Sequence, residues 1–271
     1  MIDLHSHTDH SDGSCSPAEL VRLAAEAGLE ALAITDHDTL SGYDEACLAP
    51  PPASLELIRG IEITCRYERG SIHLLGYFLH ADPGEHFRAW LSETHRHRRE
   101  RNLRLIGRLR ELGLQVAIEE VDALGRTMTG RPHFARVLVS KGYAASVEDA
   151  FQRYLGEGSA GYVERHGPGL RETIERIAAA GGVSSLAHPV RIDVDDEEAF
   201  LAQMAAAGLD AIEAFHSLHS EADSARYLEL ARRYSLAVTG GSDFHGSLHG
   251  GLRLGCPSLD RHWLDALRLR R

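Results

Sequence analysis

The chain has 271 residues, of which 43% are hydrophobic and 25% charged, and its formal net charge is −11. This length suits one barrel-sized domain with an insert, and the net negative charge argues against stable binding to duplex nucleic acid, which needs a basic surface. Widely spaced cysteines without a C-x-x-C pair argue against a disulfide framework, and no apolar stretch reaches the roughly 18 residues of a membrane span. We therefore expect a monomeric, cytoplasmic protein with no membrane partner.

The first third of the sequence alternates strand and helix patterns. An apolar run at residues 1–4 is followed by Ser16, Pro17 and Glu19, which have the order of an N-cap, a first-turn proline and a capping-box glutamate. Gly28 ends this helix, and Ser41 is a candidate cap for a second one. Further apolar runs predict strands at residues 31–35, 55–59, 61–65 and 72–78. This alternation predicts the α/β class.

The pattern changes near Gly84. The sequence predicts a long amphipathic helix at 85–112 and further helices at 118–124, 133–141 and 146–155. The alternation then resumes, with helices predicted at 170–180, 195–207 and 220–234 and strands at 183–187, 211–215 and 236–239. We therefore predict a discontinuous domain, residues 1–83 and 166–271, and a helical insertion, residues 84–165.

Histidine and acidic side chains recur where the predicted strands end. The candidates are His5, His7, His37, His188, His216, Asp243 and His245, with Glu62 and His73 inside or beside strands. The C-terminal ends of strands form the rim at which the active sites of βα-barrels lie, so we expect these side chains to form one site. Imidazole and carboxylate ligands without thiolate suit zinc, manganese or iron, and a bridging carboxylate such as Glu62 would hold two ions about 3.5–4 Å apart. The sequence therefore predicts a multinuclear metallohydrolase.

Five segments in a fixed order resemble the motifs of the PHP (polymerase and histidinol phosphatase) family. They are His5-Ser6-His7 with Asp12, Thr35-Asp36-His37-Asp38, Gly60-Ile61-Glu62, Ala187-His188-Pro189 and Gly241-Ser242-Asp243-Phe244-His245. The resemblance implies a distorted (β/α)7 TIM-like barrel with a trinuclear metal site at the C-terminal ends of its strands.

The resemblance also implies which residues bind each ion. One ion would be held by His5, His7, Glu62 and Asp243, a second by Glu62, His73 and His188, and a third by Asp12, His37 and His245. Many family members have histidine at the position of Asp12. A more oxygen-rich third site is therefore expected to prefer manganese, with zinc or iron(II) as alternatives.

The insertion narrows the expected substrate. Its position and the segment Thr129-Gly130-Arg131-Pro132-His133 resemble PHP phosphoesterases that act on nucleotides, among them enzymes that remove the 3′-phosphate of nucleoside 3′,5′-bisphosphates. Arg131 can hold a phosphate bidentately, and His133 can donate a hydrogen bond to it.

The expected reaction releases a 5′-mononucleotide and phosphate by attack of a hydroxide that bridges two metal ions. His216 would bind the phosphate or protonate the leaving alkoxide, and Asp243 and His188 would be essential for turnover. Two related substrates remain open, namely short oligoribonucleotides cleaved from the 5′ end and histidinol phosphate. A C–N hydrolase of the amidohydrolase type would need a carboxylated lysine, whereas the only lysine is Lys141 in the insertion. The complete ligand set disfavours a non-catalytic, metal-stabilised module.

The remaining polar residues receive a supporting or structural interpretation. Asp36 and Asp38 are candidates for accepting the second N–H of a ligating imidazole, and His10 and His249 lie close to the motifs. A charge run on a helix is usually a solvated face. We interpret in this way the arginines of the long helix, namely Arg96, Arg98, Arg99, Arg101, Arg104, Arg108 and Arg110.

Overall fold

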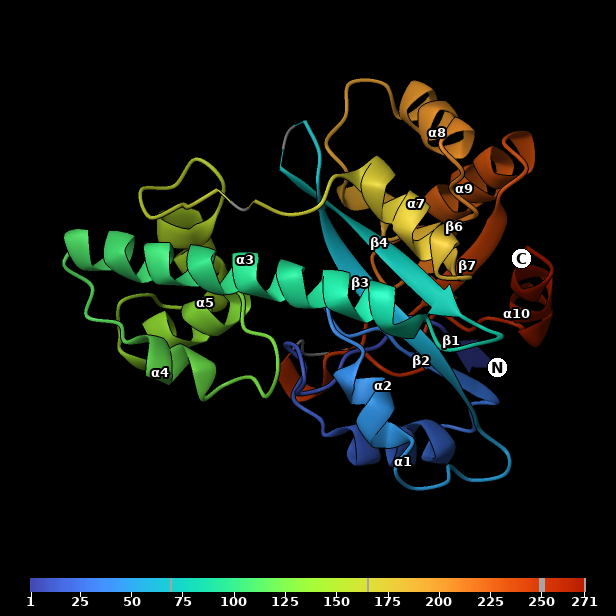
Figure 1. Cartoon of the computed structure of the whole chain (residues 1–271), viewed down its shortest axis with the longest axis horizontal. Helices are drawn as coiled ribbons and strands as arrows, with labels where there is room; N and C mark the ends of the chain where they lie inside the picture. Colours follow the sequence, from blue (N-terminus) through green and yellow to red (C-terminus); the bar gives the residue numbers. More distant parts are fainter. Residues whose placement is uncertain (69, 165, 249–251, 271) are drawn as a thin grey trace.

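The fold is built on one seven-stranded sheet (Figure 1). It is seen in a computed structural model of the chain that describes residues 1–68, 70–164, 166–248 and 252–270. The strands are β1 (Ile2–Asp3), β2 (Ala31–Ile34), β3 (Glu56–Arg66), β4 (Ser71–Phe78), β5 (Val183–Leu186), β6 (Ala211–His216) and β7 (Ala237–Gly241). They are hydrogen-bonded in sequence order, and the N–H of Leu4, just beyond β1, donates to the carbonyl of Gly240 in β7 at 3.1 Å. The sheet therefore curls into a nearly closed barrel, which confirms the predicted fold class.

One strand of the barrel runs in the opposite direction. β4 is antiparallel to both of its neighbours, β3 and β5, whereas the other neighbouring strands are parallel. The prediction of two strands at 55–59 and 61–65 is wrong, because β3 is continuous and its Gly60 pairs with Tyr77. A Cβ atom at Gly60 would lie 2.6 Å from Cγ2 of Thr35. Glycine here allows a close approach of the chain rather than a break in the strand.

Helices cover the barrel. They are α1 (Pro17–Glu26), α2 (Ser41–Ala46), α7 (Leu170–Ala179), α8 (Glu197–Ala206), α9 (Glu221–Arg233) and α10 (Arg261–Arg268). Ser16 caps α1 by accepting the N–H of Glu19, and Gly28 follows this helix with a φ of +74°, as expected. The predicted cap Ser41 is instead the first residue of α2, and its N-cap Leu40 has no side-chain acceptor.

The core of the barrel is apolar at the end opposite the polar residues. Leu4, Leu75 and Tyr77 are fully buried, and the hydroxyl of Tyr77 donates to the carbonyl of Leu4 at 2.9 Å. The sequence analysis did not predict α10, which packs against the first residues of the parallel strands. Burial of each large apolar side chain is worth about 1.5–3 kcal/mol, so this packing holds firmly the strands that carry the polar site.

A second group of helices lies between β4 and α7 in the sequence. It contains α3 (Gly84–Glu111), α4 (Ile118–Asp122), α5 (Arg131–Ser140), α6 (Val147–Ala150) and a π-helical turn at Phe151–Leu155. In Figure 1, α3 extends from the barrel, and α4 and α5 pack beneath its far half. Leu105 and Leu109 of α3 form a separate apolar core with Val121 and Phe134. The boundary of this insertion at 84–165 remains a proposal. Neither α3 nor any other helix in the described part of the chain is long and apolar enough to cross a membrane.

Candidate metal centre

The nine side chains predicted as metal ligands lie at one end of the barrel. His5 and His7 follow β1, His37 follows β2, His188 follows β5, and Asp243 and His245 follow β7, while Asp12 lies in the loop after β1 and Glu62 and His73 lie in β3 and β4. Because β4 runs against β3, a residue near its start reaches the same end as the residues that follow the parallel strands. The hydroxyl of Ser6 donates to the carbonyl of Ala33 at 2.6 Å, away from the site.

The first group of side chains contains His5, His7, Glu62 and Asp243. Nε2 of His5 lies 3.4 Å from Oε2 of Glu62 and 3.3 Å from Oδ1 of Asp243, and Nε2 of His7 lies 3.3 Å and 3.2 Å from the same two atoms. Both Nε2 atoms and Oε2 of Glu62 are buried without a hydrogen-bond partner among the described residues. Buried polar atoms without partners are costly. A cation between these four atoms would satisfy them, so the residues fit a metal ion.

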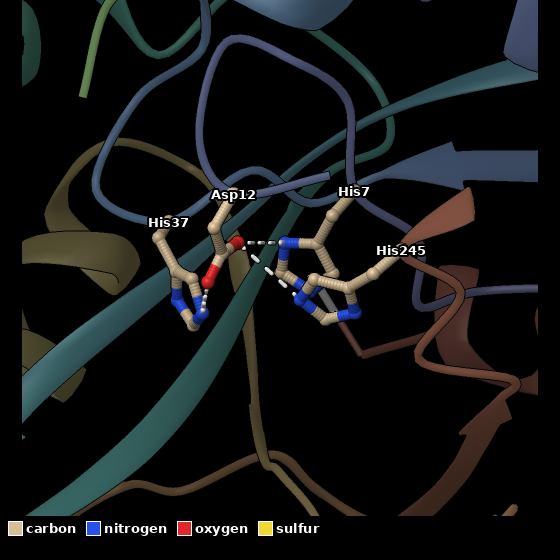
Figure 2. A group of neighbouring side chains, drawn as sticks. All are labelled: His7, Asp12, His37 and His245. Atoms are coloured by element: carbon tan, nitrogen blue, oxygen red, sulfur yellow. Dashed lines mark ion pairs between the residues drawn. The ribbon is translucent and has the colours of Figure 1, made fainter. Parts of the chain in front are cut away.

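A second group surrounds Asp12 and is drawn in Figure 2. Oδ1 of Asp12 lies 3.3 Å from Nε2 of His245 and 3.9 Å from Nδ1 of His7, and Oδ2 lies 3.6 Å from Nε2 of His37. The rings of His7 and His245 are stacked, with centroids 4.1 Å apart. The three residues assigned to the third ion are therefore adjacent. His7 lies between this group and the first.

The third group is centred on Glu62. Its Oε1 lies 2.7 Å from Nδ1 of His73 and 3.0 Å from Nε2 of His188, and its Oε2 lies 3.0 Å from Nδ1 of His37. Glu62 thus lies close to histidines of all three proposed ligand sets, and its two oxygens suit a carboxylate that bridges two ions. His37 belongs geometrically to this group as well as to the Asp12 group.

Burial and charge together set the protonation of this cluster. Burial lowers the pKa of His73 to about 4, so its ring is neutral near pH 7, as a metal ligand requires. Burial also opposes a charge on His7, but Asp243 and Glu62 outweigh it and raise the pKa of His7 to about 10. Burial opposes ionisation of Glu62 too, yet the histidines around it hold its pKa well below the ordinary value. Glu62 is therefore ionised, and its negative charge favours a cation beside it.

Glu213 is a site residue that the sequence analysis did not include. It is fully buried in β6, its Oε1 lies 2.9 Å from Nδ1 of His5, and its Oε2 accepts the backbone N–H of His188 at 2.7 Å. A proton on Nδ1 of His5 leaves Nε2 free to bind a metal ion. The backbone of His188 has a φ of +27°, a conformation that few non-glycine residues adopt. The hydrogen bond from its N–H to Glu213 helps to hold His188 in this conformation. A lone glutamate in an otherwise apolar strand was the signal that could have revealed it.

The aspartates beside His37 bind segments that surround the metal centre. Asp36 accepts hydrogen bonds from the N–H and hydroxyl of Thr8 and from the hydroxyl of Ser11, at 2.7–2.8 Å, so it shapes the loop that carries Asp12. Asp38 forms an ion pair with Arg98 and accepts the N–H of Thr64 at 3.0 Å. That either aspartate accepts the second N–H of a ligating imidazole stays a prediction.

A cavity of approximately 1580 Å³ connects the metal centre to the insertion. It is lined on the barrel side by Asp12, Glu62, His73, His188 and Asp243, and on the insertion side by Arg98, Arg101, Arg131 and His133. This arrangement places fixed positive charge beside a centre that can hold cations, which suits a substrate with more than one anionic group.

Arg131 and His133, the predicted substrate residues, lie at the start of α5. The guanidinium of Arg131 lies 5.9 Å from the ring centroids of both Phe151 and Tyr162, and its Nη1 donates to the carbonyl of Leu155 at 3.4 Å. Burial lowers the pKa of Arg131 from its ordinary, very high value. Nδ1 of His133 accepts the N–H of Gly130 at 3.1 Å, and burial lowers the pKa of its imidazole. A neutral ring with Nδ1 as acceptor carries its proton on Nε2, so His133 is a hydrogen-bond donor.

Two arginines interpreted as part of a solvated helix face are in fact buried. Arg98 and Arg101 are only 8% and 3% exposed and line the cavity. They lie three or four residues apart on the same face of α3 as the buried residues Phe87, Leu91 and Thr94. That spacing was the signal that could have separated them from exposed neighbours such as Arg96.

His216 lies behind the metal centre and does not line the cavity. Its ring is fully buried, with Nε2 3.4 Å from Oδ2 of Asp243, and its Nδ1 accepts the N–H of Leu218 at 3.1 Å. Nε2 of a neutral His216 therefore carries the proton and points toward Asp243. This geometry favours orientation of Asp243 over the predicted contact with the substrate. His249, which the sequence analysis noted as close to a motif, lies outside the described residues.

Comparison with known proteins gives consistent matches. A protein of Haemophilus influenzae named 5′-3′ exoribonuclease is 34% identical over 246 residues, which cover 90% of this chain and 89% of that protein. A 3′,5′-nucleoside bisphosphate phosphatase of Chromobacterium violaceum is 32% identical over 94% of this chain and 90% of its own length. A crystal structure from Bifidobacterium adolescentis matches with a TM-score of 0.86 at 34% identity, covering 99% of this chain and 96% of that one.

Both named relatives are phosphoric ester hydrolases by name. The PHP domain matches residues 3–164, which include the β1 to β4 half of the barrel and six of the nine candidate ligands. The remaining candidate ligands follow β5 and β7 of the same barrel, at the same end. On this evidence the chain belongs to the PHP domain family.

Proposed function

We propose that the chain is a divalent-metal-dependent phosphoesterase that removes the 3′-phosphate of nucleoside 3′,5′-bisphosphates and releases a 5′-mononucleotide. The observation that carries the proposal is the cavity, in which a cluster of carboxylates and imidazoles shares one space with the buried Arg98 and Arg101 and the half-buried Arg131. A substrate with two separate phosphates matches this pair of anion-binding regions. The matches to a bisphosphate phosphatase and an exoribonuclease support the same class of substrate.

We propose three ligand sets, each made of side chains that lie next to one another. His5, His7, Glu62 and Asp243 would hold one ion, Glu62, His73 and His188 a second, and Asp12, His37 and His245 a third. We propose manganese, with zinc or iron(II) as alternatives, because the donors are nitrogen and oxygen without sulfur. Bound divalent cations would activate a water molecule and neutralise the phosphoryl oxygens.

The chain's own residues position the substrate and the ligands. Arg131 and His133 would bind the phosphate that is not hydrolysed, with Nε2–H of His133 as donor. The N–H on Nε2 of His216 would hold Asp243 in its orientation, and Glu213 would do the same for His5 and His188. Asp243 and His188 would therefore be essential. The leaving O3′ would take its proton from water in the cavity.

Short 5′-phosphorylated oligoribonucleotides are the second candidate substrate. Hydrolysis of the bond between phosphorus and O3′ releases a 5′-mononucleotide from either compound. The name of the Haemophilus influenzae relative favours this candidate.

The test is phosphate or nucleotide release from a panel with manganese added to chelator-treated protein. The panel contains adenosine 3′,5′-bisphosphate, 3′- and 5′-AMP, histidinol phosphate and a 5′-phosphorylated trinucleotide. We expect the bisphosphate to be turned over with a higher kcat/KM than either monophosphate, because only it engages both regions of the cavity. Preference for histidinol phosphate, or turnover that does not depend on metal, would contradict the proposal.

A further inference from the structure

Three arginines of the barrel line the same cavity as the metal centre. These barrel arginines are Arg66 at the end of β3, Arg171 in the first turn of α7, and Arg191. The backbone N–H of Arg191 donates to the carbonyl of His188 at 3.0 Å. The backbone N–H of Arg66 donates to the carbonyl of Pro168 at 2.8 Å, so the end of β3 lies beside the segment that precedes α7. Three separate elements thus bring guanidinium groups to the barrel side of one cavity.

The barrel arginines are exposed and form no ion pair with a residue that the structure describes. Five glutamates besides Glu62 also line the cavity, namely Glu68, Glu148, Glu157, Glu164 and Glu172. Glu172 is paired with Arg176 at 3.0 Å. In a chain with a net charge of −11, arginines that remain without carboxylate partners beside a cavity form a local site for anions. They are separate from Arg131 and His133, which belong to the insertion.

The size of the cavity indicates a ligand larger than one nucleotide. Its volume of approximately 1580 Å³ exceeds the roughly 300–1,000 Å³ of usual small-ligand pockets. Hydrolysis of an oligonucleotide at this site breaks the same phosphorus–O3′ bond as hydrolysis of a bisphosphate. The water oxygen bonds to phosphorus, O3′ leaves and gains a proton, and the shortened chain keeps the phosphate on its new 5′ end. The downstream nucleotides are attached to that phosphorus, so they must extend from the metal centre along the barrel side or out of the cavity.

We infer that Arg66, Arg171 and Arg191 bind the phosphodiester groups downstream of the scissile phosphate, so that the site accepts short 5′-phosphorylated oligonucleotides as extended substrates. The inference rests on the proposed function, because it uses the same metal centre and the same broken bond. It adds a binding subsite on the barrel side, and it makes the rate depend on the number of downstream phosphates.

The experiment compares kcat/KM for adenosine 3′,5′-bisphosphate with that for 5′-phosphorylated di-, tri- and tetranucleotides. The proteins are the wild type, the triple variant Arg66→Gln, Arg171→Gln, Arg191→Gln, and each single variant. Arg232→Gln is the control, because Arg232 is exposed on α9, pairs with Glu229 and does not line the cavity. Thermal melting checks that every variant is folded.

In the wild type we expect kcat/KM to rise with length. In the triple variant the ratio of trinucleotide to bisphosphate kcat/KM should fall about tenfold, and each arginine lost should lower the salt dependence for the trinucleotide by somewhat less than one unit of slope. Arg232→Gln should keep the wild-type ratio. An unchanged ratio in the triple variant, or a wild type without any gain with length, would overturn the inference while bisphosphate turnover still supports the proposed function. Failure of the wild type on every phosphate ester would instead overturn the proposed function.

Discussion

Replacement of Glu213 by glutamine should weaken metal binding without changing any proposed ligand. The carboxylate accepts from two donors that are both buried, Nδ1–H of His5 at 2.9 Å and the N–H of His188 at 2.7 Å. Glutamine has nearly the same shape but only one acceptor atom, so one of the two donors must face an NH2 group. Loss of a hydrogen bond to a charged group costs about 1.5–3 kcal/mol. At about 1.4 kcal/mol for each factor of ten, this corresponds to about 10- to 100-fold in affinity, which agrees with typical losses when a group that orients a metal ligand is removed.

The assay is competition for manganese between the protein and a chromophoric chelator, together with kcat measured at increasing manganese. We expect Glu213→Gln to need a 10- to 100-fold higher manganese concentration for half-maximal activity and to approach wild-type kcat at saturation. Glu198→Gln is the control, since Glu198 is exposed on α8 and contacts Arg233 rather than the site. Manganese affinity of Glu213→Gln within twofold of the wild type, in a variant shown to be folded, would refute the argument that Glu213 orients His5 and His188.

Three further predictions concern the site. Asp243→Asn and His188→Ala should each reduce turnover by at least about 100-fold, since each removes a proposed ligand. Near-normal phosphate release from either purified variant would exclude the proposed ligand sets. Arg131→Lys should raise KM for adenosine 3′,5′-bisphosphate about tenfold with a smaller change in kcat, because lysine cannot replace a planar bidentate donor; an unchanged KM would show that the second phosphate lies elsewhere. Manganese affinity should rise with pH by up to about tenfold per unit between pH 6 and 9, because the pKa of His7 is raised to about 10 by Asp243 and Glu62, so a proton must leave before the ion binds. Chelator competition across that range measures it, and affinity independent of pH would contradict it.

The sequence predicted the parts of the site that depend on local pattern. Motifs such as His5-Ser6-His7 stand directly after apolar runs, and the ends of parallel strands meet at one rim, so these residues could be placed together without coordinates. The direction of β4 was not predictable in this way, because an apolar run has the same pattern in a parallel and in an antiparallel strand. Its reversal is what brings His73 to the rim from the start of a strand rather than from its end.

The residues that were missed are those whose roles depend on burial. Glu213 is separated from His5 by 208 residues, and Arg98 from Asp38 by 60, so neither contact leaves a local signature. Arg98 and Arg101 resemble their exposed neighbours in composition and differ only in the face of α3 that they occupy. A stricter count of helical spacing along α3 would have found them. The hydrogen bonds of Glu213 could be recognised only in the three-dimensional structure, because they join residues that lie in or just after different strands of the barrel.

Backbone hydrogen bonds connect the insertion to the loop that carries Asp12. A mutation in either segment should therefore affect both substrate binding and metal binding. The N–H groups of Arg126 and Met128 donate to the carbonyls of Asp9 and His10, at 2.9 and 2.8 Å. The ring of His10, one of the histidines close to the motifs, lies 2.8 Å from the hydroxyl of Thr127 and 3.0 Å from a carboxylate oxygen of Glu45. The loop after β1 that carries Asp12 is therefore held by the segment leading into α5 and Arg131. The same hydrogen-bonded segment, residues 126–128, thus positions both a proposed metal ligand, Asp12, and a proposed phosphate-binding residue, Arg131. Mutations in this segment should therefore change metal affinity and KM together.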